Sequence, residues 1–98
     1  MQGQLNFPGE VHWYTFDGKA GDAVYIVLAE GTKGSPMWPW LGLLAPDGSV
    51  VYEDYAPSNP SVQIDRTLTQ TGKYTIRVRD YALVGGSYVL SFNMLVKP

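Results

Sequence analysis

The strongest constraint on the fold is a period-two alternation of apolar and polar residues that Gly and Pro interrupt at short intervals. In the run YTIRVRD, Tyr74, Ile76 and Val78 form an apolar row, and the residues between them form a polar row. The chain contains eleven Gly and seven Pro, and no stretch has a helical period. Short alternating runs bounded by turn residues are typical of an all-β sandwich or barrel.

Eight strands are predicted, at residues 2–6, 11–17, 22–29, 39–45, 49–53, 61–67, 72–79 and 86–95. We therefore expect an all-β fold, a single-domain antiparallel β-sandwich over residues 1–98. It should be jelly-roll-like, with about eight strands in two sheets. A chain of this length can bury one core and has no length left for a second domain.

Charge and residue types exclude several classes of function. A net charge of −2 argues against nucleic acid and against an anionic membrane as partners. The chain has no Cys and a single His, His12, with no Ser or Thr motif beside it. Catalysis needs a nucleophile with its base, or a spaced carboxylate pair, so we expect no enzyme activity and no required cofactor.

Three segments resemble the bacterial pre-peptidase C-terminal domain, a jelly-roll-like β-sandwich appended to secreted bacterial enzymes. They are EVHWYTFDGKAGDAVYI (10–26), LGLLAPDGSVV (41–51) and LTQTGKYTIRVRDYALVGGSYVLSF (68–92). The resemblance implies a secreted, extracellular bacterial protein that is part of a larger enzyme with an attached catalytic domain. Some relatives are accessory modules of proteases, and others are similar to carbohydrate-binding modules of glycoside hydrolases.

The chain departs from this family at positions where relatives carry acidic residues. Glu10 is retained, but His12 follows it, and Trp38 and Trp40 take the later acidic positions. Glu10 and His12 are two residues apart on one strand face, so both side chains could reach one surface or dimer-bridging metal ion. The alternative is that His12 is a solvated surface side chain.

A two-residue hairpin turn at Pro46-Asp47 would set the register of the two strands around it. Leu43 would then lie opposite Val50, and the outer face would carry four large or charged side chains beside a bare patch at Gly42. The residues expected on the core face are Leu41, Leu43, Val50 and Tyr52. Those expected on the outer face are Trp38, Trp40, Glu53 and Tyr55.

Two outward tryptophans on one strand predict a binding surface, because a monomer seldom exposes such a patch without a ligand. From their spacing we expect a non-catalytic carbohydrate-binding module that stacks nearly coplanar indoles on a β-linked glucan, such as cellulose or a mixed-linkage β-glucan. The carbohydrate-binding residues would be Trp38, Trp40, Glu53, Tyr55, Arg77 and Tyr81, with Asp54, Arg79 and Asp80 nearby.

Three alternatives remain open at this point. The chain could be an accessory or interaction domain of a secreted protease, as the family resemblance allows. Trp38 and Trp40 could instead cover an end of the sandwich, or form the interface of a weak dimer. Trp13, in the second predicted strand, is expected to be structural cover rather than a ligand contact.

Overall fold

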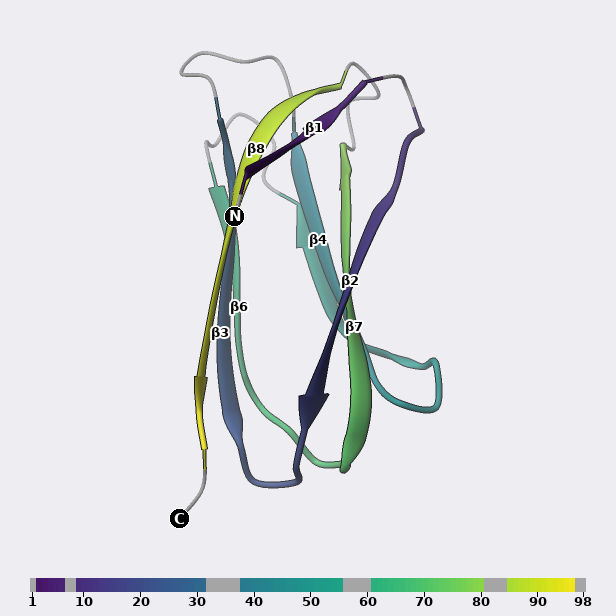
Figure 1. Ribbon diagram of the computed structural model, residues 1–98, viewed down its shortest axis with the longest axis vertical. Coiled ribbons are helices and arrows are strands. Elements are labelled where there is room, and N and C mark those ends of the chain that lie inside the picture. Colours follow the sequence, from purple (N-terminus) through teal and green to yellow (C-terminus); the bar gives the residue numbers. More distant parts are fainter. Residues whose placement is uncertain (1, 7–8, 32–37, 56–60, 81–84, 97–98) are drawn as a thin grey trace.

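The alternating runs form eight antiparallel strands in two facing sheets of four (Figure 1). The structure is a computed structural model that describes residues 2–6, 9–31, 38–55, 61–80 and 85–96. The strands are β1 (Gln2–Leu5), β2 (His12–Gly18), β3 (Ala23–Glu30), β4 (Pro39–Leu44), β5 (Val50–Tyr55), β6 (Ser61–Thr67), β7 (Gly72–Asp80) and β8 (Gly86–Leu95). The expected all-β fold of eight strands in two sheets is confirmed.

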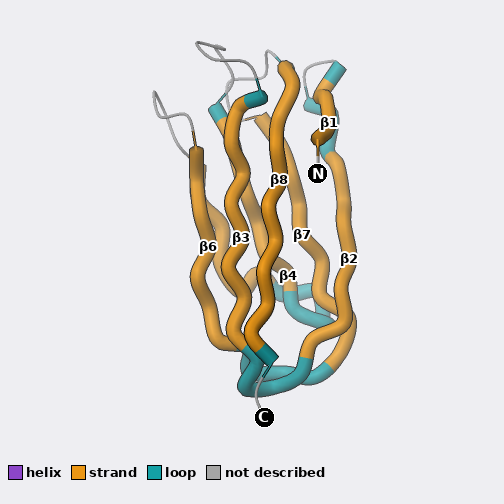
Figure 2. The backbone as a smooth tube through the Cα atoms, turned by 60° about the vertical axis from the view of Figure 1, so that its left-hand side comes forward, coloured by secondary structure: helices purple, strands orange, loops and turns teal. Residues whose placement is uncertain are grey.

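The strand order is β1-β8-β3-β6 in one sheet and β2-β7-β4-β5 in the other. Figure 2 shows β8 and β3 at the centre of the first sheet, with β1 beside only the upper part of β8. No helix in the described part of the chain is long and apolar enough to cross a membrane.

The core lies between the sheets and takes every second residue of the central strands. The apolar row of β7 is inside, with Tyr74, Ile76 and Val78 at most 3% exposed. Ile26 and Leu28 of β3 face them from the other sheet and are fully buried. Burying large apolar side chains from both sheets is the main stabilising contribution in a sandwich without disulfides.

The register of the hairpin between β4 and β5 differs from the predicted one. Ala45 pairs with Ser49, through a 2.8 Å bond from the Ala45 N–H to the Ser49 carbonyl, and Gly48 adopts a φ of 89°. The loop is thus one residue longer than predicted, with the positive-φ glycine typical of a bulged turn. A second irregularity follows, because Leu44 pairs with Val50 while Leu43 pairs with Tyr52.

Each of these two irregularities shifts the pairing of β4 with β5 by one residue. Together they shift it by two residues, which leaves the inward or outward direction of most side chains as predicted. Leu41 and Leu43 are fully buried, and Tyr52 packs against the core. Val50 is the exception, since it lies opposite Leu44 on the outer face and is 50% exposed. The prediction that Val50 belongs to the core is therefore wrong.

Candidate functional site

The outer face of the β2-β7-β4-β5 sheet gathers most of the residues that the sequence singled out. Register pairs Trp13 with Arg77, Arg77 with Gly42, and Gly42 with Glu53, which makes one row across the sheet. The next row runs from Arg79 through Trp40 to Tyr55. We call this surface the aromatic face. It consists of Trp13, Trp38, Trp40, Glu53, Tyr55, Arg77 and Arg79.

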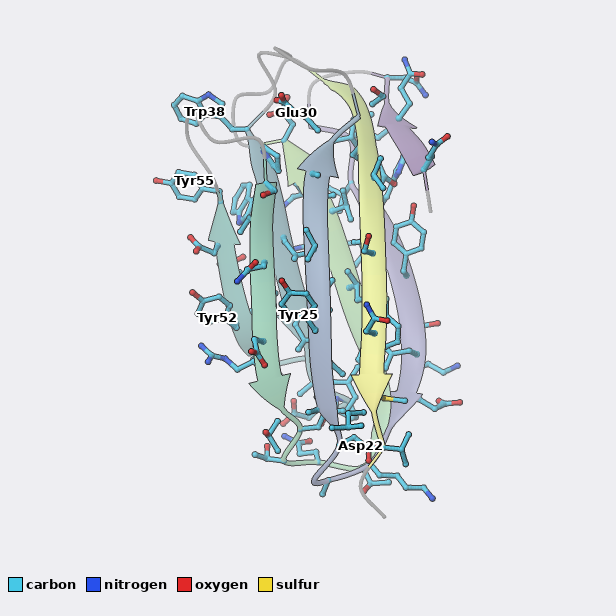
Figure 3. All side chains as sticks on the ribbon, turned by 90° about the vertical axis from the view of Figure 1, so that its left-hand side faces the viewer. Asp22, Tyr25, Glu30, Trp38, Tyr52 and Tyr55 are labelled. Carbon is cyan, nitrogen blue, oxygen red and sulfur yellow. The ribbon has the colours of Figure 1, made fainter. Side chains whose placement is uncertain are left out.

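The rings of the aromatic face do not form a flat platform. Trp38 stacks on Tyr55, with ring centroids 6.5 Å apart and planes inclined by 6°, and Figure 3 shows the two side by side at the end of the sheet. Trp40 also lies 6.5 Å from Tyr55, but its plane is inclined by 68°. The two indoles are therefore steeply inclined to each other, and the expected coplanar arrangement is wrong.

A guanidinium group already covers one face of the Trp40 indole. The Cζ atom of Arg79 lies 3.5 Å from the Trp40 ring centroid, a close cation–π contact. The Arg79 Nε atom is buried there without a hydrogen-bond partner among the described residues. Burial lowers the pKa of Arg79, the charge of Arg77 lowers it further, and Glu53 opposes both effects.

The patch beside Gly42 is filled rather than bare. An ideal Cβ on Gly42 would come within 3.3 Å of the Arg77 guanidinium, so that side chain lies across the glycine. Arg77 forms an ion pair with Glu53, which also lies 3.6 Å from Arg79. The lack of a side chain at Gly42 thus lets Arg77 lie flat on the sheet and reach β5.

Asp80 holds the end of the aromatic face in place. It is 5% exposed, and its two carboxylate oxygens accept hydrogen bonds from the backbone N–H groups of Trp38, at 2.9 Å, and Gly85, at 2.7 Å. The sequence predicts Asp80 only as a neighbour of the carbohydrate-binding residues. Its parity gave the better signal, because an acid that continues the buried row of Tyr74, Ile76 and Val78 needs internal donors. Tyr81 lies outside the described residues.

Glu10 and His12 belong to a hydrogen-bonded chain between the sheets. Glu10 Oε2 contacts His12 Nε2 at 2.6 Å, and His12 Nδ1 contacts the Tyr88 hydroxyl at 2.5 Å. The Tyr88 hydroxyl also contacts that of Tyr14 at 2.5 Å. Both ring nitrogens of His12 are therefore engaged by side chains, which leaves neither for an ion.

The proposed metal site is not supported by this arrangement. Among the residues that the structure describes, no three His, Asp or Glu side chains form a group that could hold a metal ion. His12 is also not a solvated surface residue, since 27% of its side chain is exposed and both nitrogens have partners.

Because the Tyr88 hydroxyl is buried, the stability of the folded chain should fall as the pH rises above the ordinary pKa of tyrosine. Burial raises the pKa of its hydroxyl above the ordinary value of 10.0, and the hydrogen bond with Tyr14 adds to the effect. A group whose pKa is raised in the folded state stabilises it fully below the unfolded pKa and loses that contribution as pH rises. We expect the thermal midpoint to fall more steeply above about pH 10 for the native chain than for Tyr88→Phe. Equal slopes for the two proteins would contradict this expectation.

Both the sequence and the fold are similar to those of known proteins. A sequence model of the bacterial pre-peptidase C-terminal domain matches residues 10–80. No curated protein gives a significant sequence match. Among solved structures, the fold is similar to that of PliG from Aeromonas hydrophila, a periplasmic inhibitor of g-type lysozyme. The TM-score is 0.71, with 17% identity, over 97% of this chain and 83% of that chain.

These findings correct the functional prediction. The family resemblance expected from the sequence is confirmed, and it favours the alternative of an accessory domain over a carbohydrate-binding module. The prediction of a module that binds β-glucan or cellulose is wrong, as is that of a polysaccharide partner. The geometry supplies a physical reason, because inclined indoles with Arg79 over Trp40 cannot both stack on one extended glucan.

Proposed function

Because the chain belongs to the bacterial pre-peptidase C-terminal domain family, we propose that it is a non-catalytic accessory domain that contacts a protein. Domains of this family belong to bacterial pre-peptidases, which supports a location outside the cytoplasm and within a larger secreted enzyme. The periplasmic location of PliG, and its action on another protein, agree with this proposal, although that likeness concerns the fold alone.

The observation that carries the proposal is the composition of the aromatic face. Trp, Tyr and Arg are the residues most enriched among those that dominate protein–protein binding energy. Trp13 is 57% exposed and Tyr55 is 38% exposed, while Arg77 and Arg79 lie between them on the same sheet.

The aromatic face is also held rigid before any partner arrives. Arg77 is fixed by Glu53, Arg79 by the Trp40 indole, and the Trp38 backbone by Asp80. Side chains that are already ordered lose little conformational entropy on binding, so more of the contact energy is retained as affinity. We propose that the partner is an extended protein substrate of the attached enzyme, whose apolar side chains pack on Trp13, Trp38 and Tyr55.

Unfolded casein is a suitable probe for this proposal. We expect the chain to bind casein with a Kd in the micromolar range, and the triple variant Trp13→Ala/Trp38→Ala/Tyr55→Ala to bind at least about ten-fold more weakly. Biolayer interferometry with immobilised casein measures both. A matched triple variant of exposed apolar residues on β3 and at the end of β8, in the other sheet, is Tyr25→Ala/Leu95→Ala/Val96→Ala, and it should keep the native affinity. Equal affinities for the two triple variants, or no casein binding by the native chain, would refute the proposal.

A further inference from the structure

The edge of β8 is only partly covered. β8 runs from Gly86 to Leu95, but the pairing with β1 ends at Val89, opposite Gln2. From Ser91 to Leu95, β8 pairs with β3 on one side, and no other strand of the described ranges pairs with it on the other. Figure 2 shows this lower part of β8 extending well past β1.

The uncovered segment lacks the features that protect sheet edges. Natural edge strands are kept from pairing with other chains by charged side chains, by Pro or by bulges. The other long edge strands carry charges, namely Asp17 in β2, Glu53 and Asp54 in β5, and Asp65 and Arg66 in β6. The β8 segment 91–95, SFNML, has no charge and no Pro, and Leu95 is 77% exposed.

An apolar opening lies beside this edge, between β8 and β2. A cavity of 210 Å³ is lined by Tyr14, Thr15, Phe16, Ile76, Leu90 and Phe92. Phe92 is 38% exposed even though its ring packs on Phe16, with centroids 4.7 Å apart. A second cavity of 490 Å³ continues along the same side and includes Met94 and Val96. A strand added here would need apolar side chains at alternate positions on its inner face.

We propose that a second copy of this chain supplies that strand, through antiparallel pairing of the two 91–95 segments. Asn93 would lie opposite Asn93 of the other copy, and Ser91 opposite its Leu95. Phe92 of each copy would lie opposite Met94 of the other, on the inner face where the cavities lie. The inference does not rest on the proposed function, because the aromatic face belongs to the other sheet.

Three observations favour a second copy over a different polypeptide. The segment itself has the alternation that the incoming strand needs, with Phe92 and Met94 inward and Ser91, Asn93 and Leu95 outward. It has no charge, so two copies meet without repulsion at the contact. Its length matches the uncovered edge, because β1 occupies β8 up to Val89 and a two-fold pairing about Asn93 uses 91–95 of both copies.

The first test uses a disulfide, since the chain contains no Cys. Residues directly opposite in an antiparallel pair have Cα atoms about 4.5–5.5 Å apart, which a disulfide can bridge. We expect Asn93→Cys to form a covalent dimer under mild oxidation at least about ten-fold faster than Gln63→Cys, which lies on the exposed far edge of the same sheet. Equal rates for the two variants would overturn the proposal.

The second test measures mass in solution. Sedimentation velocity between about 10 µM and about 1 mM should show the native chain moving from monomer towards dimer. Asn93→Lys places two like charges opposite each other and should remain monomeric, whereas Gln63→Lys should dimerise like the native chain. A native chain that stays monomeric throughout, or an Asn93→Lys variant that dimerises as the native chain does, would overturn the proposal. The latter result would place the dimer contact elsewhere, for example on the aromatic face.

Discussion

Replacing Asp80 with Ala should lower the free energy of unfolding by about 3 kcal/mol. The carboxylate is buried, and its removal leaves the backbone N–H groups of Trp38 and Gly85 without the acceptor that each has now. A buried donor that loses its acceptor costs about 1–3 kcal/mol, and hydrogen bonds to a charged group are at the upper end. Urea unfolding followed by far-UV circular dichroism measures the change.

The same variant should loosen one end of the aromatic face. The backbone bond to Asp80 fixes Trp38, whose ring stacks on Tyr55. We therefore expect the Trp38 indole N–H resonance to broaden or shift in the variant, while that of Trp13 stays in place. Asp54→Ala is the matched control, since Asp54 accepts the Tyr55 N–H at 2.9 Å but is exposed. That control should change stability by no more than about 0.5 kcal/mol, and an equal loss in both variants would contradict the role given to Asp80.

The fold could be predicted from the sequence because each side chain of a strand points either into the core or towards solvent. The apolar row of β7 lies inside, and Leu41 and Leu43 lie inside, as the pattern indicates. The hairpin register could not be predicted, because it depends on a bulged turn at Gly48 and on a second bulge before Val50. A single bulge reverses the face to which the following side chains point, and a second bulge restores it. The sequence does not show how many residues the turn contains.

The sharing of one outer face could be predicted from the sequence, but the geometry of the side chains on it could not. Parity alone places Trp40, Glu53 and Arg77 on one outer face, which the register confirms. The inclination of the rings depends on rotamers, and the cation–π contact of Arg79 with Trp40 depends on which strand neighbours β4. The sequence shows how many aromatic rings are present but not how their planes are oriented. The interpretation as a flat platform for sugar rings therefore had no geometric support. The burial of Asp80 could have been predicted, because Asp80 continues the buried row of Tyr74, Ile76 and Val78.

Gly3→Ala should detach β1 from β8, although Ala adds a single methyl group. An ideal Cβ on Gly3 would lie 2.4 Å from both the Cζ atom and the hydroxyl oxygen of Tyr88. Tyr88 is fully buried, and its hydroxyl is held by His12 and Tyr14, so the ring has no room to retreat. Overpacking of this kind costs about 1–3 kcal/mol, which the chain can avoid by releasing its four-residue first strand.

Amide hydrogen exchange measures the release of β1 directly. In Gly3→Ala, the amides within Gly86–Val89 that donate to β1 should lose protection by about thirty-fold, while the β3–β6 ladder keeps its native protection. Gln2→Ala is the control, because Gln2 is exposed on the same strand and should leave exchange unchanged. Loss of protection throughout both sheets would instead show that β1 cannot open on its own. If β1 does open, the whole uncharged edge of β8 is exposed, so Gly3→Ala should also self-associate at lower concentration than the native chain.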